Sequence, residues 1–184
     1  MTNDPTGENR LDVIWAPWRM AYIASDIKDQ PEPVASELFL PGADESCFLC
    51  QAAVCDKSAF RDRLILRRGE RILTVLNRFP YNNGHLLVTP RRHVARLDLL
   101  TAEESAELQA ELTRLTILLE KCVNAAGFNI GLNLGRCAGA GLPGHLHWHI
   151  IPRWIGDANF TTTIGSAKVI PQSMEALFDL LGGE

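Results

Sequence analysis

The sequence predicts an α+β domain in which one long helix packs on an antiparallel sheet. Residues 71–76 and 85–89 are short apolar runs rich in branched side chains, which are typical of strands. The turn Asn82-Asn83-Gly84 separates them, and so short a connection favours an antiparallel pair. Residues 128–134 and 145–150 read as further strands, with a long helical pattern before them. Two hairpin-like halves on either side of one helix indicate an α+β fold.

The long helix is predicted to begin at Thr101 and to bury one face. Glu104 follows Thr101 by three residues, which is the spacing of a capping box. Gly127 is the expected stop, and a second helix is expected over residues 173–181. Apolar residues recur at helical spacing, and we interpret them as core: Leu108, Leu112, Leu115, Leu119 and Val123.

The first 46 residues are expected to form an N-terminal extension and loop, and residues 47–184 the main domain. The aromatic stretch 15–23 contains Pro17 at a position suited to the first turn of a short helix. Residues 28–46 contain three prolines and no sustained period, which indicates a loop or lid. The sequence has neither a signal-peptide pattern nor an apolar run of membrane-spanning length, so a cytoplasmic protein without a membrane partner is expected.

The charge balance narrows the class of ligand. The formal net charge is −4, whereas proteins that bind nucleic acid usually present a basic surface. We therefore expect no nucleic-acid partner. A small phosphorylated ligand is compatible with this charge, because it needs only local hydrogen-bond donors.

The histidines at positions 145, 147 and 149 form the most informative motif. Side chains alternate along a strand, so residues two apart share one face. His145, His147 and His149 are therefore expected on one face, while the residues between them face the core. A structural role is the usual explanation for a single histidine, but three on one strand face indicate a functional site.

Three kinds of chemistry suit this row: a catalytic metal site, attack of a neutral imidazole on phosphorus, and phosphate binding without catalysis. The preceding loop, Gly139-Ala140-Gly141-Leu142-Pro143-Gly144, favours phosphate, because glycines expose backbone N–H groups to an anion. Pro143 has no N–H, so the expected donors are those of Gly139, Ala140 and Gly141.

The segment 145–153, His-Leu-His-Trp-His-Ile-Ile-Pro-Arg, resembles the signature of the histidine triad (HIT) superfamily of nucleotide hydrolases and transferases. The resemblance continues at residues 76–80 and 84–93. Residues 15–20, residues 152–160 and Asn133-Leu-Gly135 resemble one branch of it, the bacterial diadenosine tetraphosphate phosphorylases. The family implies a HIT-like fold with an antiparallel sheet of about five strands, and a homodimer or larger homo-oligomer with the long helix as the dimer element.

The resemblance implies a role for each matching residue. His147 is the expected nucleophile, which attacks the α-phosphorus and carries the nucleotidyl group. His149 and His85 would line the phosphate site and stabilise charge on the non-bridging oxygens. Residues 142–144 are Leu, Pro and Gly where many relatives have Ser or Gln, so no acid for the leaving group is assigned. Three further residues are expected to contact the nucleotide or orient the site: Asn77, Asn133 and Trp154.

A structural zinc site is also implied. Cys47 and Cys50 form a close pair, which in a reducing compartment is more typical of metal binding or redox chemistry than of a disulfide. In several branches of the family a similar pair joins two histidines to hold zinc, and the matching positions are His93 and His145. Two thiolates and two imidazoles would close a tetrahedral site, as in structural zinc centres. No organic cofactor is expected.

The leading hypothesis is an enzyme that splits a dinucleoside polyphosphate through nucleotidyl-His147. With inorganic phosphate as the second nucleophile, diadenosine tetraphosphate gives ADP and ATP, and with water it gives AMP and ATP. The two outer segments that resemble the phosphorylases, residues 15–20 and 152–160, favour phosphate. Three alternatives stay open: uridylyl transfer to a sugar phosphate, in which Gln typically replaces His149; a nucleotide-binding module with weak catalysis; and a catalytic metallohydrolase.

Overall fold

The computed structural model describes residues 34–158 and 169–183. Their centre is a five-stranded sheet in the order β1-β2-β3-β5-β4, in which all neighbouring strands are antiparallel. The predicted α+β class and strand number are therefore confirmed. The helix expected within residues 15–23 lies outside the described residues. The strands are β1 (Ile65–Arg68), β2 (Ile72–Leu76), β3 (Leu86–Pro90), β4 (Gly127–Leu132) and β5 (Trp148–Arg153).

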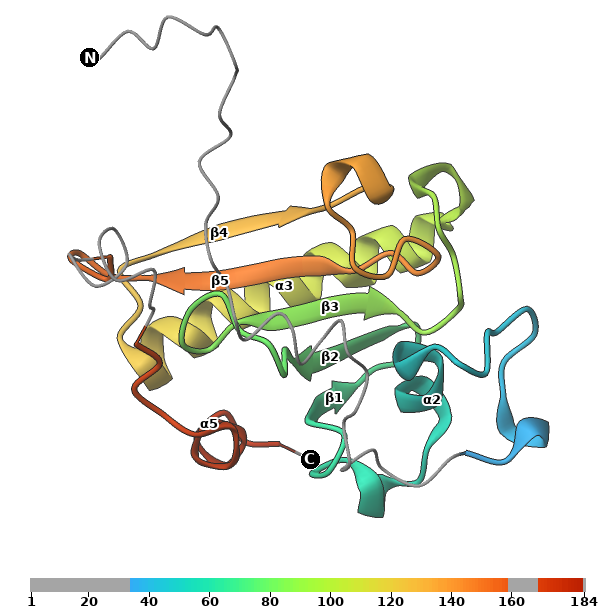
Figure 1. Cartoon of the computed structure of the whole chain (residues 1–184), viewed down its shortest axis with the longest axis horizontal. Helices are drawn as coiled ribbons and strands as arrows, with labels where there is room; N and C mark the ends of the chain where they lie inside the picture. Colours follow the sequence, from blue (N-terminus) through green and yellow to red (C-terminus); the bar gives the residue numbers. More distant parts are fainter. Residues whose placement is uncertain (1–33, 159–168, 184) are drawn as a thin grey trace, which may run out of the picture.

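The long helix α3 (Ala102–Val123) covers one face of the sheet, as Figure 1 shows. Thr101 is its N-cap, and both hydrogen bonds of the predicted capping box with Glu104 are present. Leu115 and Leu119 are fully buried against Ile150 and the other apolar residues of this core. The predicted stop at Gly127 is wrong: Asn124 ends the helix in the left-handed conformation, and Gly127 is already in β4. Asparagine tolerates that conformation better than most non-glycine residues do.

The opposite face of the sheet packs on the short helix α2 (Phe48–Val54), which the sequence did not predict. Leu49 of α2 contributes to a second core cluster with Leu73 and Leu87. Leu87 is the cross-strand partner of His149. Residues that pair directly across a sheet point to the same face, so His149 lies on the α2 side, away from the long helix.

Short elements complete the domain. Helix α5 (Met174–Leu180) has Ser173 as its N-cap and follows the prediction for residues 173–181. Gly84 adopts φ +71°, and a Cβ there would lie 3.2 Å from Pro152 Cγ, so the predicted turn before β3 requires glycine. No helix in the described part of the chain is long and apolar enough to cross a membrane. The 3₁₀ turns among the described residues are Ser36–Leu38, Lys57–Ala59, Leu97–Leu99 and Arg136–Ala138.

Candidate active site

The three histidines of the predicted row belong to two adjoining sites. Strand β5 begins at Trp148, so the strand expected from residue 145 starts later, and His145 and His147 precede it. The segment that holds them is nevertheless fixed from both sides. The backbone N–H of Leu146 donates to the Val94 carbonyl, and the Thr89 hydroxyl donates to the Leu146 carbonyl, each at 2.7 Å.

His147 is held in one tautomer by its own backbone. Its Nδ1 lies 2.8 Å from the carbonyl oxygen of His145. A carbonyl only accepts, so Nδ1 carries the proton and Nε2 carries the lone pair. The residue is buried, with 8% of its surface exposed. A neutral imidazole with an unprotonated Nε2 is the form that attacks an electrophile.

His85 and His149 form a hydrogen-bonded pair beside His147. The Nε2 of His85 lies 2.9 Å from the Nδ1 of His149, and the rings of His149 and His147 are 5.2 Å apart. Burial, followed by the neighbouring His147, lowers the pKa of His149 to about 4. With this pKa, His149 is neutral at pH 7 and offers one ring N–H as a donor and one ring nitrogen as an acceptor.

Asn77 and Tyr81 support this pair from the β2–β3 connection. The side chain of Asn77 contacts the Nδ1 of His85 at 3.2 Å, which agrees with an orienting role. The Tyr81 ring stacks on His149 at 5.6 Å and lies 4.7 Å from His85. Sequence reasoning missed Tyr81, because one aromatic residue next to a turn has no periodic partner that would mark it.

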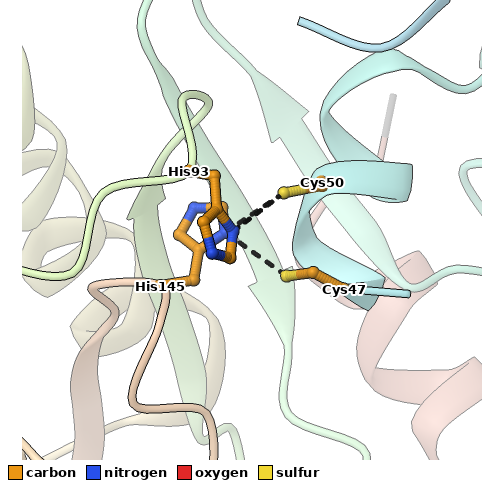
Figure 2. A group of neighbouring side chains, drawn as sticks. All are labelled: Cys47, Cys50, His93 and His145. Atoms are coloured by element: carbon orange, nitrogen blue, oxygen red, sulfur yellow. Dashed lines mark hydrogen bonds between the residues drawn. The ribbon is translucent and has the colours of Figure 1, made fainter. Parts of the chain in front are cut away.

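The four residues implied as zinc ligands converge from three segments of the chain, as Figure 2 shows. Cys47 and Cys50 lie at the start of α2, His93 follows β3, and His145 precedes β5. The ligand atoms lie within 4.8 Å of one another. The Nδ1 of His145 is 3.4 Å from the sulfur of Cys47, and the Nδ1 of His93 is 3.2 Å from that of Cys50.

The protonation of this Cys₂His₂ cluster fits a metal ion. The Nε2 of His145 lies 2.8 Å from the Pro90 carbonyl, so it carries the proton and leaves a lone pair on Nδ1 toward the sulfurs. Burial raises the pKa of Cys47 to about 12, and a cation beside the thiol is what would stabilise its thiolate. The donor set and its closed, buried arrangement suit a structural metal and leave no open position for substrate.

The remaining predicted site residues are more scattered. Asn133 follows the end of β4, whose last residue pairs with Trp148, next to His147. The N–H groups of Gly139 and Ala140 donate to carbonyls within their own loop, those of Arg136 and Gly135. Gly141 is exposed. Trp154 lies past the far end of β5, and its indole N–H donates to the carbonyl of Val123 at 3.1 Å.

Comparisons with known proteins assign the chain to a family. The AP-4-A phosphorylase of Mycobacterium tuberculosis is 41% identical over 177 residues, which cover 96% of this chain and 85% of that protein. The bis(5'-nucleosyl)-tetraphosphatase [asymmetrical] of Schizosaccharomyces pombe is 41% identical over 78 residues, 42% of each chain. A zinc-bound histidine triad family protein from Mycobacterium smegmatis has a similar structure, with a TM-score of 0.54, 27% identity, and coverage of 64% of this chain and 80% of that one. The family model of the HIT domain matches residues 61–154. The chain therefore belongs to the HIT family.

Proposed function

We propose that this protein transfers a nucleotidyl group from a dinucleoside polyphosphate through a covalent nucleotidyl-His147 intermediate, and that its reaction is the phosphorolysis of diadenosine tetraphosphate. The observation that carries the proposal is the geometry of His147. The carbonyl of His145 holds its Nδ1–H, so the lone pair of Nε2 is available next to the His85–His149 pair. A neutral nucleophile flanked by neutral donors suits an anionic phosphoryl group.

The chemistry divides into two displacements. In the first, Nε2 of His147 forms a bond to the α-phosphorus, and the bond from that phosphorus to the bridging oxygen breaks, which releases ATP. In the second, an oxygen of inorganic phosphate attacks the same phosphorus, the P–N bond breaks, and ADP leaves. One substrate and one phosphate thus give ADP and ATP, and His147 returns to its initial form.

Phosphate is preferred over water as the second nucleophile because of the likeness to the M. tuberculosis phosphorylase along most of the chain. The likeness to the S. pombe tetraphosphatase is shorter and keeps hydrolysis as the alternative. The test is product analysis after incubation with diadenosine tetraphosphate, with and without phosphate. ADP that forms only with phosphate supports phosphorolysis, whereas AMP whose formation phosphate does not change supports hydrolysis.

A variant with His147→Ala tests the intermediate and separates an enzyme from a binding module. We expect turnover to be lost while nucleotide binding persists, because the binding surface loses only one side chain. Mixtures of the unaltered protein with radiolabelled substrate, quenched in alkaline denaturant because a P–N bond to imidazole hydrolyses in acid, should contain protein-bound label that the variant lacks. Unchanged turnover in the variant would exclude His147 as the nucleophile.

We also propose that Cys47, Cys50, His93 and His145 hold one zinc ion. Zinc would supply structural crosslinking there, because all four positions of a tetrahedron are filled by protein. Metal analysis of protein purified without added zinc should find about one equivalent, and Cys47→Ser should lose it. Cys55→Ser is the matched control, since Cys55 is equally buried but lies outside the cluster. Zinc absent from the unaltered protein would end this proposal.

The same family relationship supports a homodimer. Ile117 on α3 and Ile130 on the edge strand β4 are 62% and 45% exposed, and these are apolar side chains that a partner subunit would cover. Light scattering should give twice the mass of the chain, and Ile117→Lys combined with Ile130→Lys should give the monomer.

We propose nucleotide contacts for Asn133, residues 139–141 and Trp154, and a domain boundary near residue 47.

A further inference from the structure

Two backbone N–H groups determine where the proton of His85 lies. The N–H of Tyr81 is 3.0 Å from Nδ1 of His85, and a backbone N–H can only donate. The Oδ1 of Asn77 accepts from the N–H of Phe79 at 3.0 Å, so the other side of the amide, Nδ2, faces the same Nδ1 at 3.2 Å and also donates. The Nδ1 of His85 is thus an acceptor, and the proton of the neutral ring is on Nε2.

The proton of His149 follows from that of His85. The Nε2–H of His85 donates to Nδ1 of His149 at 2.9 Å, so His149 is also protonated on Nε2. This second Nε2 is buried and has no hydrogen-bond partner among the described residues. A buried N–H without a partner is costly, and a ligand oxygen is the group that would satisfy it.

We propose that Asn77 is a positioning residue. Its amide and the backbone N–H of Tyr81 set the direction of the hydrogen bonds in the His85–His149 pair. As a result, His149 presents a fixed N–H donor to a phosphoryl oxygen beside the lone pair of His147. The inference rests on the proposed function for the identity of that oxygen. If the hydrogen bonds of the pair ran in the opposite direction, Nε2 of His149 and Nε2 of His147 would both present lone pairs to an anionic phosphoryl group and repel it. The direction of these hydrogen bonds therefore determines whether the site attracts the phosphoryl group of the substrate.

The Tyr81 ring helps to keep this direction. It stacks on His149 with an interplanar angle of 25° and covers His85 at 4.7 Å. Water that reached the two rings would offer each nitrogen another donor or acceptor, and it would allow both tautomers to be populated. The Tyr81 ring over the His85–His149 pair excludes that water. The backbone N–H of Tyr81 also sets the tautomer of His85.

Long-range ¹H–¹⁵N NMR correlation on the full chain tests the inference, because it reports which ring nitrogen carries the proton. In the unaltered protein we expect His85 and His149 to be protonated on Nε2 and His147 on Nδ1. Asn77→Asp places an acceptor opposite Nδ1 of His85, so that nitrogen should acquire a proton. We expect kcat for diadenosine tetraphosphate to fall at least about tenfold, with KM changed less than about threefold.

Asn129→Asp is the matched control, since it makes the same change of charge at an exposed residue whose Oδ1 accepts from Arg153. It should leave the three tautomers and kcat unchanged. His149 protonated on Nδ1 in the unaltered protein would overturn the inference without any variant. A raised KM in Asn77→Asp with unchanged tautomers would also overturn it, since that result describes a residue that only contacts the ribose. The spectra are recorded without substrate, so the tautomers are tested independently of activity. Failure of the unaltered protein to convert diadenosine tetraphosphate would contradict the proposed function and leave the result on the tautomers unchanged.

Discussion

Replacing Thr89 with valine should lower both the stability of the fold and the rate of the reaction. The Thr89 side chain is fully buried, and its hydroxyl donates to the carbonyl of Leu146 at 2.7 Å. Valine has nearly the same shape, so the main change is a buried carbonyl that loses a donor, which costs about 2 kcal/mol. For a chain of this size that loss lowers Tm by about 4–8 °C.

The effect on catalysis follows from the position of Leu146 between His145 and His147. Loss of this hydrogen bond frees the carbonyl of Leu146 and with it the backbone that aims His147. Because a displacement of about 1 Å can cost roughly a hundredfold in rate, we expect kcat of Thr89→Val to fall at least about tenfold. The measurements are urea unfolding and steady-state kinetics under conditions in which the variant is folded.

Thr74→Val is the matched control for Thr89→Val. Thr74 is also buried, at 1% exposed, and its hydroxyl donates at 2.7 Å to Glu111 of α3, away from the histidines. This variant should lose comparable stability and keep kcat within about twofold. Equal losses of kcat in the two variants, or an unchanged kcat in Thr89→Val, would refute the link between the Leu146 carbonyl and the nucleophile.

Three further predictions concern the cap, the metal cluster and acid stability. Thr101→Ala should lower the free energy of unfolding by about 1 kcal/mol in urea titrations, because the N–H of Glu104 loses its cap, and an unchanged midpoint would contradict this. Gly144→Ala should weaken zinc retention against a chelator, because its Cβ would lie 3.1 Å from Nε2 of His93 and displace that ring. Burial lowers the pKa of His149 from 6.5 to about 4, so below pH 6.5 the unfolded chain binds more protons than the folded one. The contribution of His149 to stability should therefore be constant above about pH 6.5 and fall by at most about 3 kcal/mol toward pH 4. His149→Gln should remove this part of the fall, and the part due to His145, whose pKa burial also lowers to about 4, should persist.

Regular patterns made much of the fold predictable. The apolar runs of β2 and β3 and the capping box of α3 are local signals, and the structure contains all three. Strand β1 was missed because two of its four residues are arginines. These charges have partners outside the strand: Arg67 pairs with Glu111 of α3, which is distant in sequence, and Arg68 lies over the Phe60 ring at 4.9 Å. No local pattern shows that a charge in a strand will be paired.

The candidate site was predictable as a set of residues but not as an arrangement. The resemblance to the HIT family identified the four residues of the Cys₂His₂ cluster, which come together in the fold from three separate parts of the sequence. Alternation along a strand predicted one row of equivalent histidines. The structure instead starts β5 at Trp148 and surrounds each ring differently. The partners that create the difference, such as the carbonyl of Pro90 and the N–H of Tyr81, are backbone groups that any residue type supplies.

The three histidines differ in the partners of their ring nitrogens, and these partners would allow one row to perform three tasks. The Pro90 carbonyl places the proton of His145 on Nε2, which turns a lone pair on Nδ1 toward the two cysteines. The carbonyl of that same residue places the proton of His147 on Nδ1, which leaves Nε2 as a nucleophile. A metal ion that fixes the ring of His145 would therefore also restrict the carbonyl that orients His147, although it touches no substrate. Substitutions in this row should accordingly be judged by the donor or acceptor that they place at each position, because glutamine can replace an N–H donor at 149 but supplies no nucleophile at 147.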